Sequence, residues 1–244
     1  MLSKARIKFI KSLQVKKYRK QEQCFVVQGA KSVQELLRSD FETIFVAGTA
    51  DFLRDLPGTS AELVEASEKD LALVGEFQSN DAGLAVARMR PNDPIPPDHP
   101  SITLVLDDIR DPGNLGTIIR TADWYGITHV VSSLETADIY NPKVISSTMG
   151  SFTRVKIYYT GLPEFLATTA LPVYGCFLQG EDVHATNFAK ACMIVIGNES
   201  RGISEEVEKF ISKKITIPQI GKAESLNAAI ATAIVLDNAV HARR

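Results

Sequence analysis

The stretch LVLDDIRDPGNLGTIIRTADWYGI, residues 104–127, decides the fold of this chain. The run 102–106 that leads into it is rich in β-branched and aliphatic residues, which predicts a buried strand. Pro112 and two nearby glycines then predict a turn, and apolar residues at helical spacing predict a helix over 115–125. A strand, a glycine-rich loop and a helix in this order place backbone N–H groups at the carboxyl end of a strand, where open α/β sheets bind ligands.

The same alternation continues to the end of the chain. Short apolar runs predict strands at 102–106, 129–133, 155–159, 173–178, 193–197 and 214–217. Helical spacing predicts helices at 115–125, 142–148, 163–168, 204–210 and 226–241. This order predicts an α/β fold with a mostly parallel sheet and helices on both faces. The first 90 residues alternate shorter strands and helices, which predicts a smaller α/β unit.

A change of composition separates these two parts. Residues 90–100 hold five prolines among polar residues, which is typical of a semi-rigid linker. We therefore predict a first domain at 1–90, a linker at 91–100 and a second domain at 101–244.

The overall composition is that of an ordinary soluble globular protein, with 45% hydrophobic and 23% charged residues. No run is long and apolar enough to span a bilayer, and the N-terminus lacks the apolar core of a secretory signal. The cysteines, Cys24, Cys176 and Cys192, are scattered and form no metal-binding spacing. These features predict a cytoplasmic protein with reduced thiols, no metal and no membrane contact.

The charge of the chain is unevenly distributed. The net charge is −2, yet the first twenty residues, predicted to be helical, carry eight Lys or Arg and no Asp or Glu. Such a cluster is typical of contact with nucleic acid, although a solvated helix face would show the same pattern. The candidate nucleic-acid-binding residues within it are Lys4, Arg6, Lys16, Lys17, Arg19 and Lys20.

Three loops at predicted strand ends carry small, amide or hydroxyl residues. The first holds Asn114, with Arg120 further along the helix that follows. The second, 197–204, holds Glu199 between two glycines and ends at Ser204, which we expect to cap the next helix. In the third, 217–228, we expect Ser225 to cap the last helix, with Asn227 in its first turn. Simple turn and cap chemistry would explain each loop alone, whereas together they predict one composite pocket. The G-x-G-x-x-G and G-K-[ST] patterns of nucleotide-binding loops are absent.

Taken together, these segments resemble the three motifs of the SpoU (TrmH-like) RNA 2′-O-ribose methyltransferases of the SPOUT superfamily. The usual forms are N-x-G-x-x-x-R-x-A, G-x-E-x-x-G-(I/L)-S and I-P-(M)-x-G-x-x-x-S-L-N. Here they run from Asn114 to Ala122, from Gly197 to Ser204 and from Ile217 to Asn227. The stretch FVVQG, residues 25–29, similarly resembles the F-x-V-E-G of the L30e-like substrate-binding domain of this family, with Gln28 in place of Glu. The third motif continues with alanines at 228 and 229 rather than Val-Ser.

The resemblance implies a deep trefoil knot in the second domain, a homodimer formed through it, and S-adenosylmethionine bound among the three loops. The residues it suggests for the cofactor are Gly197, Asn198, Ile217, Leu226 and Ala228. It assigns the methyl transfer to a ribose 2′-oxygen to Arg120, Asn114, Glu199, Ser225 and Asn227. Because a guanidinium stays protonated, we expect Arg120 to stabilise the developing alkoxide or to dock the adjacent phosphate rather than to act as a base.

The RNA is not fixed by the sequence. Ribosomal and transfer RNA both fit, and the separate first domain favours ribosomal RNA by analogy. Two other functions remain open at this point. One is a non-enzymatic RNA-binding protein that keeps the fold, and the other is a small-molecule enzyme that uses a nucleotide on a doubly wound sheet.

Overall fold

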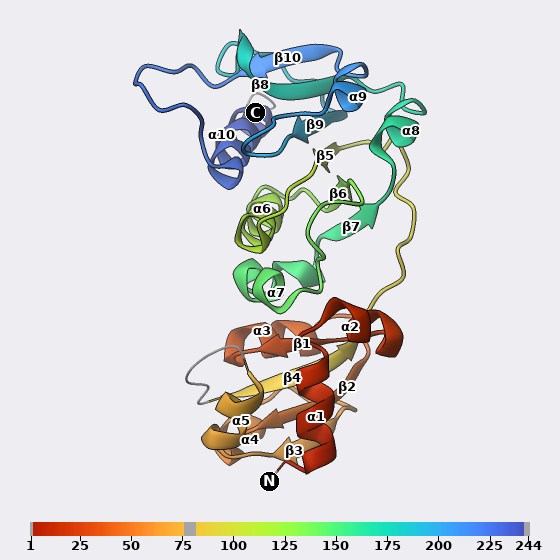
Figure 1. Cartoon of the computed structure of the whole chain (residues 1–244), viewed down its shortest axis with the longest axis vertical. Helices are drawn as coiled ribbons and strands as arrows, with labels where there is room; N and C mark the ends of the chain where they lie inside the picture. The colour runs from red at the N-terminus through yellow and green to blue at the C-terminus, as the bar shows by residue number, and fades with distance from the viewer. Residues whose placement is uncertain (1, 76–81, 242–244) are drawn as a thin grey trace. The chain divides into compact units, whose positions relative to one another are not determined.

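The computed structural model describes residues 2–75 and 82–241. The chain divides into two compact units, one of residues 1–91 with 138–153, the other of residues 92–137 with 154–244. Figure 1 follows the chain through both units. Within the described residues, none of the helices combines the length and the apolar character needed to cross a membrane.

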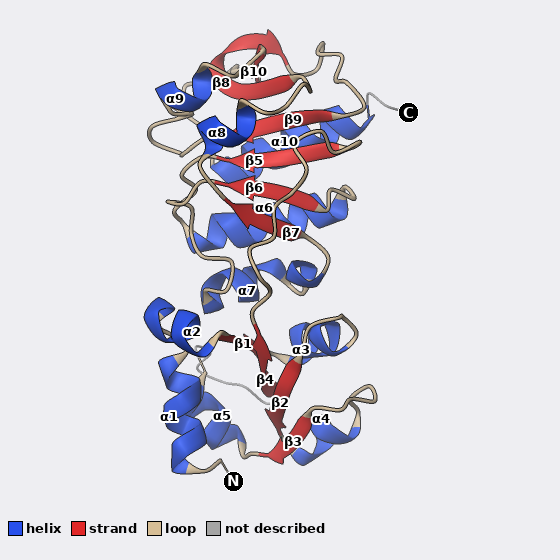
Figure 2. Ribbon diagram, turned by 90° about the vertical axis from the view of Figure 1, so that its right-hand side faces the viewer, coloured by secondary structure: helices blue, strands red, loops and turns tan. Residues whose placement is uncertain are grey.

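The second unit is built on a six-stranded sheet in which every pair of neighbouring strands is parallel. The strands are β5 (Ile102–Leu106), β6 (His129–Ser132), β7 (Lys156–Tyr159), β8 (Val173–Asp182), β9 (Cys192–Ile196) and β10 (Lys213–Thr216), in the order β10-β8-β9-β5-β6-β7. All six strands that the sequence predicts are therefore present. The helices on one face are α6 (Pro112–Trp124) and α10 (Ala228–His241), and those on the other are α8 (Leu162–Leu166) and α9 (Glu205–Glu208), as Figures 1 and 2 show. The predicted fold class is confirmed.

The two central strands of this sheet are buried along their whole length. Every residue of β5 and β9 is buried, because helices cover both faces. Val105, Val131 and Val195 belong to one core cluster that also includes residues of α8 and α9. The polar residues that follow these strands are consequently held at one edge of a rigid sheet.

Helix α6 begins three residues earlier than the apolar spacing predicts. Asp111 is its N-cap and accepts a hydrogen bond from the backbone N–H of Asn114 at 2.8 Å, while Pro112 occupies the first turn. Asn114 therefore lies in the first turn of helix α6 and not in the loop before it. The helix backbone consequently fixes the direction of the Asn114 side chain.

The proline-rich segment packs against the second unit rather than spanning open space as a linker. Asn92 exchanges two hydrogen bonds with the backbone of Tyr159, both at 2.9 Å. Ile95 is buried in the core cluster of this unit, and Asp98 accepts a hydrogen bond from the backbone of Ala170. The prolines thus stiffen segment 91–100, which is held to the second unit by both polar and apolar side chains.

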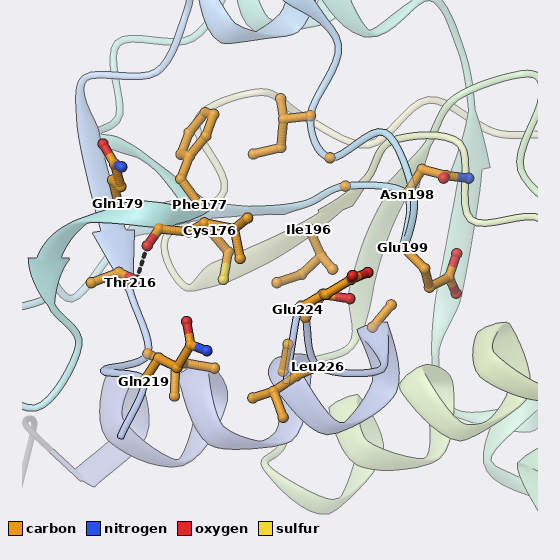
Figure 3. A pocket seen from close by; sticks show the side chains of 18 of the residues that line it. Cys176, Phe177, Gln179, Ile196, Asn198, Glu199, Thr216, Gln219, Glu224 and Leu226 are labelled. Atoms are coloured by element: carbon orange, nitrogen blue, oxygen red, sulfur yellow. Dashed lines mark hydrogen bonds between the residues drawn. The ribbon is translucent and has the colours of Figure 1, made fainter. Parts of the chain in front are cut away.

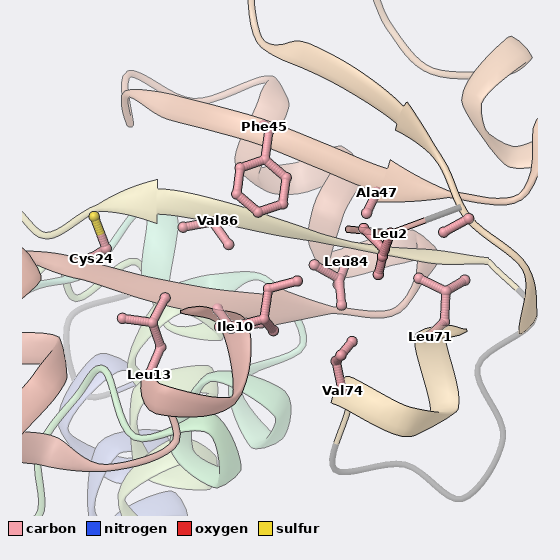
Figure 4. Packing of buried hydrophobic residues seen from close by; sticks show 12 residues of the cluster. Leu2, Ile10, Leu13, Cys24, Phe45, Ala47, Leu71, Val74, Leu84 and Val86 are labelled. Atoms are coloured by element: carbon pink, nitrogen blue, oxygen red, sulfur yellow. The ribbon is translucent and has the colours of Figure 1, made fainter. Parts of the chain in front are cut away.

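The first unit contains a four-stranded mixed sheet in the order β1-β4-β2-β3. The strands are β1 (Cys24–Gln28), β2 (Thr43–Gly48), β3 (Glu62–Glu65) and β4 (Gly83–Arg88), and the helices are α1 (Lys4–Ser12), α2 (Lys16–Glu22), α3 (Ala30–Leu37), α4 (Ala50–Arg54), α5 (Glu68–Val74) and α7 (Pro142–Thr148). Ile10, Leu13, Leu71 and Leu84 pack in its core, which Figure 4 shows between the sheet and two helices.

Residues 138–153, which the sequence assigns to the second domain, belong to the first unit. Phe25 of β1 is fully buried and its ring contacts those of Phe41, Tyr140 and Phe152, with centroids 4.6–5.9 Å apart. Helix α7 and the turn Ser151–Thr153 therefore complete the packing around β1. Local spacing predicts helix α7 correctly, but strand β1, against which it packs, is more than 100 residues earlier in the sequence, so no local pattern indicates the contact.

The prediction of a single helix over residues 1–20 is wrong, because the helix is interrupted at residues 13–15, between α1 and α2. Leu13 is buried at the break, and its carbonyl and that of Gln14 both accept hydrogen bonds from Arg19 at 2.9 Å. The Arg19 guanidinium also pairs with Asp138 at 2.8 Å and is almost completely buried. Arg19 thus satisfies the carbonyls that the break exposes and connects α2 to the 138–153 segment.

Replacing Arg19 with alanine is expected to lower the free energy of unfolding by about 3–5 kcal/mol, because it leaves a partly buried carboxylate without its cation. Thermal or urea unfolding measures this loss. Lys20→Ala, an exposed position on the same helix, serves as the control and should change stability by less than about 0.5 kcal/mol. Equal stability of the two variants would show that Arg19 has no structural role.

Candidate active site

A pocket of about 1050 Å³ opens beside the middle of β8 and the carboxyl ends of β9 and β10. The loops that follow β9 and β10 form much of its wall. All five residues predicted to contact a cofactor line it, namely Gly197, Asn198, Ile217, Leu226 and Ala228. In Figure 3 the side chains of Cys176, Ile196 and Leu226 come from three different parts of the chain and border the same space. The sequence argument that strand ends share one composite pocket is correct for these loops.

One hydrogen-bonded chain joins the three loops. The side-chain amide of Asn114 donates to a carboxylate oxygen of Glu199, and its carbonyl oxygen accepts from the amide of Asn227 at 2.9 Å. These residues are 85 and 113 positions from Asn114 in sequence. Glu199 also lines the pocket. The structure therefore brings together three of the five predicted catalytic residues in one polar network beside the pocket.

Ser225, the fourth, lines the pocket but does not cap the last helix as predicted. The cap is Asn227, whose side-chain oxygen accepts from the backbone N–H groups of Ala229 and Ile230 at 2.9 and 3.4 Å. Because α10 begins at Ala228, the helix starts two residues later than expected. Asn227 thus satisfies the helix end with its oxygen and reaches Asn114 with its nitrogen.

Asn198 uses its side chain to shape the loop. Its amide nitrogen donates to the backbone carbonyl of Asp108 at 2.8 Å, and its oxygen accepts from the N–H groups of Ser200 and Arg201 at 2.9 and 3.2 Å. In Figure 3 this side chain points away from the cavity. Only the backbone of Asn198 remains available to a cofactor in the pocket.

Asp107 is a residue that the sequence reasoning missed as part of the site. It is almost fully buried, and one carboxylate oxygen accepts from both the backbone N–H and the hydroxyl of Ser204 at 2.8 Å. Ser204 therefore makes no side-chain cap for α9, contrary to expectation. The sequence signal was available, since Asp107 directly follows a buried apolar strand. Asp107 and Asn198 together fix the loop of Glu199 against the loop of Asn114.

Replacing Asp107 with alanine is expected to weaken binding of S-adenosylmethionine, the ligand expected in this pocket, by about tenfold or more, because the loop loses two charge-assisted hydrogen bonds. Asp107→Asn keeps an acceptor oxygen and should stay within about threefold of the wild type. Calorimetric titration measures the affinity, and thermal unfolding checks that both variants fold. Wild-type affinity in the alanine variant would contradict this role.

Comparison with known proteins identifies the family to which this site belongs. Residues 101–237 match the model of the SpoU rRNA Methylase family. The chain belongs to this family. Residues 4–85 match the MRM3-like substrate binding domain, so the family relationship extends to the smaller unit. The predicted family is confirmed, and with it the methyltransferase class and S-adenosylmethionine as the cofactor.

Three relatives of the SpoU family cover nearly the whole chain. The 23S rRNA (guanosine(2553)-2′-O)-methyltransferase RlmP of Bacillus subtilis is 31% identical over 241 residues, which are 95% of this chain and 94% of RlmP. A TrmH-family protein of Porphyromonas gingivalis has a TM-score of 0.88 at 39% identity and 98% coverage of both chains. The AdoMet-bound rRNA methyltransferase of Sinorhizobium meliloti has a TM-score of 0.87 at 27% identity, covering 99% of this chain and 96% of that one.

The pocket has the properties that the cofactor of the SpoU family requires. Ile196, Ile217 and Leu226 supply apolar surface, while Gln179, Glu199 and Glu224 supply polar groups. A Cβ at Gly197 would lie only 2.3–2.5 Å from the backbone of Gly202 and Ile203, so this wall is closely packed bare backbone. S-adenosylmethionine combines a flat aromatic adenine with ribose hydroxyls and charged groups, and the apolar and polar residues present fit both kinds of surface.

Arg120, the fifth predicted catalytic residue, lies outside the pocket. It is exposed on α6, and no hydrogen bond or ion pair links it to any residue among 2–75 and 82–241. The polar network of Asn114, Glu199 and Asn227 therefore does not include it. Its guanidinium is free to meet a ligand that approaches along the helix.

The six basic residues predicted to contact RNA divide into an exposed group and a group that is at least half-buried. Lys4, Lys16, Lys17 and Lys20 are exposed, as an RNA contact requires. Arg6 is half-buried, pairs with Glu62 at 2.7 Å and lies over the ring of Phe45. Arg19 is buried in its ion pair, so its prediction as an RNA contact is wrong. Charge counting could not separate these groups, because it carries no information on burial.

Cys176 is a further pocket residue that the sequence treated as a scattered thiol. Burial raises the pKa of its thiol to about 11, so Cys176 is neutral at physiological pH and acts as a small apolar group. No cluster of three metal-ligating side chains occurs in the described part of the chain.

Proposed function

We propose that this protein methylates a ribose 2′-hydroxyl of ribosomal RNA, with S-adenosylmethionine as the methyl donor. The observation that carries the proposal is the network of Asn114, Glu199 and Asn227 beside the pocket, one residue from each family motif. Ribosomal RNA is favoured over transfer RNA because RlmP, which matches 95% of this chain, is named for 23S rRNA.

The cofactor, when bound, supplies a methyl group activated by a sulfonium. The chain must hold the ribose oxygen in line with that group and assist loss of the hydroxyl proton. Gly197, Ile217 and Leu226 would hold the cofactor in the pocket, and the backbone of Asn198 and Ala228 would border it. The binding loops are already fixed by hydrogen bonds, which limits the reorganisation needed when substrates bind.

Glu199 is the group that we propose to accept a hydrogen bond from the 2′-hydroxyl. One of its oxygens accepts from Asn114, and the other has no hydrogen-bond partner within the described residues. A half-buried carboxylate in this position polarises the hydroxyl and increases the negative charge on the attacking oxygen. Asn114 holds the carboxylate in place, Asn227 donates to Asn114 in turn, and Ser225 completes the polar wall on the pocket side.

Arg120 has a different part in this proposal. A guanidinium remains protonated in proteins and cannot remove the hydroxyl proton. Because Arg120 is exposed and lies outside the pocket, we assign it to a phosphate next to the target ribose, where bidentate hydrogen bonds favour arginine. The exposed lysines Lys4, Lys16, Lys17 and Lys20 of the first unit would contact the RNA backbone at a second place.

The RNA choice is tested by methyl transfer from radiolabelled S-adenosylmethionine to separated ribosomal and transfer RNA from cells that lack the protein. We expect label in large ribosomal RNA, and a Lys16/Lys17/Lys20 triple alanine variant should raise the KM for RNA and leave cofactor affinity unchanged. Label confined to transfer RNA would overturn the choice of RNA. RNA binding without any transfer would favour a non-enzymatic RNA-binding protein.

The assembly and location of the protein complete the proposal. We infer a homodimer through the second unit, because Ile230 on α10 is 52% exposed and α10 is apolar on several sides. Sedimentation at several concentrations measures this state. The trefoil knot implied by the family and a cytoplasmic location, where the three free cysteines stay reduced, belong to the same proposal.

A further inference from the structure

The loop that follows β10 is held in shape by one side chain. Residues 218–227 are all exposed and belong to no helix or strand. Within the described residues, every hydrogen bond of residues 218–226 is made by the side chain of Gln219. Its Nε2 donates to the backbone carbonyl of Gly221 at 3.0 Å and to that of Ala223 at 2.8 Å. Gln219 therefore gives this loop a defined conformation before any ligand binds.

The same two hydrogen bonds fix the orientation of the Gln219 amide. A backbone carbonyl only accepts, so the amide atom that faces both carbonyls is the nitrogen, and both of its hydrogens are used. The oxygen, Oε1, has no hydrogen-bond partner within the described part of the chain. Gln219 lines the pocket, and in Figure 3 its oxygen is directed toward the side of the cavity that Cys176 and Thr216 border. The loop thus presents one oriented acceptor to a ligand in the pocket.

Gln219 and Glu199 belong to different ends of the pocket. In Figure 3 they lie on opposite sides of the cavity, and Glu199 is at the end where we place the methyl transfer. At the Gln219 end, the hydroxyl of Thr216 is already used, because it donates to the carbonyl of Leu178 at 3.1 Å. Cys176, Thr216 and Gln219 carry no charge there. This end therefore suits an aromatic ring with an amino group better than the charged amino-acid part of S-adenosylmethionine.

The family motif does not account for Gln219. Position 219 is methionine in the usual form of the third motif, and a thioether can neither donate to the two carbonyls nor accept strongly. We propose that Oε1 of Gln219 accepts a hydrogen bond from the amino group of the adenine ring of S-adenosylmethionine. Gln219 thereby selects adenine over a purine with a carbonyl oxygen at that position, since two acceptors would then face each other without a donor.

Binding of two cofactor analogues tests this selection without any RNA. S-adenosylhomocysteine keeps the amino group, and S-inosylhomocysteine has a carbonyl oxygen in its place. In calorimetric titration, the wild type should bind the adenosyl compound at least about tenfold more tightly. Gln219→Met should reduce this preference to less than about threefold. The ratio of the two affinities is the readout, because a loosened loop alone would weaken both compounds equally. Gln21→Met, the same change at an exposed position of α2, is the control and should keep the wild-type preference.

The outcomes separate this inference from the proposed function, which concerns RNA. Equal binding of both analogues by the wild type, or an unchanged preference in Gln219→Met, would overturn the role of Gln219 even if the protein methylates ribosomal RNA. A preference that disappears in Gln219→Met would support the role even if no RNA is methylated. 5′-Methylthioadenosine lacks the amino-acid part. If Gln219→Met weakened S-adenosylhomocysteine and left 5′-methylthioadenosine unaffected, Gln219 would face the amino-acid part and the assignment to adenine would be wrong.

Discussion

Replacing Asn114 with alanine is expected to lower the rate of methyl transfer by about 10²- to 10³-fold, as removal of a preorganised polar group in an active site typically does. Asn114 is the only one of the three network residues that touches both others, donating to Glu199 and accepting from Asn227. Its loss would release the Glu199 carboxylate and break the connection between all three loops. Single-turnover kinetics with saturating cofactor and RNA measures the effect on the chemical step.

The Asn114 variant needs a control that removes a side-chain amide elsewhere in the protein and leaves the fold intact. Asn187→Ala makes the same chemical change at an exposed position outside the pocket and should retain wild-type turnover. The affinity of Asn114→Ala for S-adenosylmethionine should remain within about tenfold of wild type, since Asn114 does not line the cavity. A turnover rate within about threefold of wild type would show that the network has no catalytic role.

Replacing Gly197 with alanine is expected to abolish measurable cofactor binding, because no space exists for a methyl group. The added Cβ would lie 2.3 Å from the backbone carbon of Gly202 and 2.4 Å from the nitrogen of Ile203. These are backbone atoms, so the loop itself would have to move, and with it Glu199. Overpacking of this kind typically costs about 1–3 kcal/mol in stability, which leaves the chain folded but the pocket wall displaced.

Calorimetric titration with S-adenosylmethionine tests the Gly197 variant. Gly58→Ala, where an added Cβ meets nothing within 4 Å, is the matched control and should bind as wild type. Circular dichroism should show that Gly197→Ala keeps its secondary structure. Cofactor affinity within about threefold of wild type in a folded Gly197→Ala protein would mean that this wall does not form the cofactor site.

Local patterns in the sequence predict the strands and the sheet well, because buried parallel strands are continuous apolar runs. They are less successful at helix ends, where a single side chain decides the boundary. Ser225 and Asn227 are both plausible caps by residue type, and only the contact with Asn114 shows that Asn227 takes that place. Ser204 likewise has the residue type of a cap, but Asp107 occupies its hydroxyl.

Long-range packing is the part that the sequence does not reveal. Arg19 looks like one more basic residue in a charged segment, and its partner Asp138 is 119 positions away. The aromatic contacts of Phe25 with Tyr140 and Phe152 are similarly remote, so no local rule assigns residues 138–153 to the first unit. The family motifs, by contrast, indicated the three loops correctly, because each motif holds the residue that joins the network.

The most direct test is to identify the modified nucleoside. Ribosomal RNA from cells lacking the protein would be incubated with the purified protein and S-adenosylmethionine, digested, and analysed by mass spectrometry. We predict one additional 2′-O-methylated nucleoside with the wild-type protein and, after the same short reaction time, about a hundredth of that amount or less with Asn114→Ala. A methyl group found only on a base, or a 2′-O-methyl group that forms equally with Asn114→Ala, would contradict the assignment of ribose methylation to these three loops.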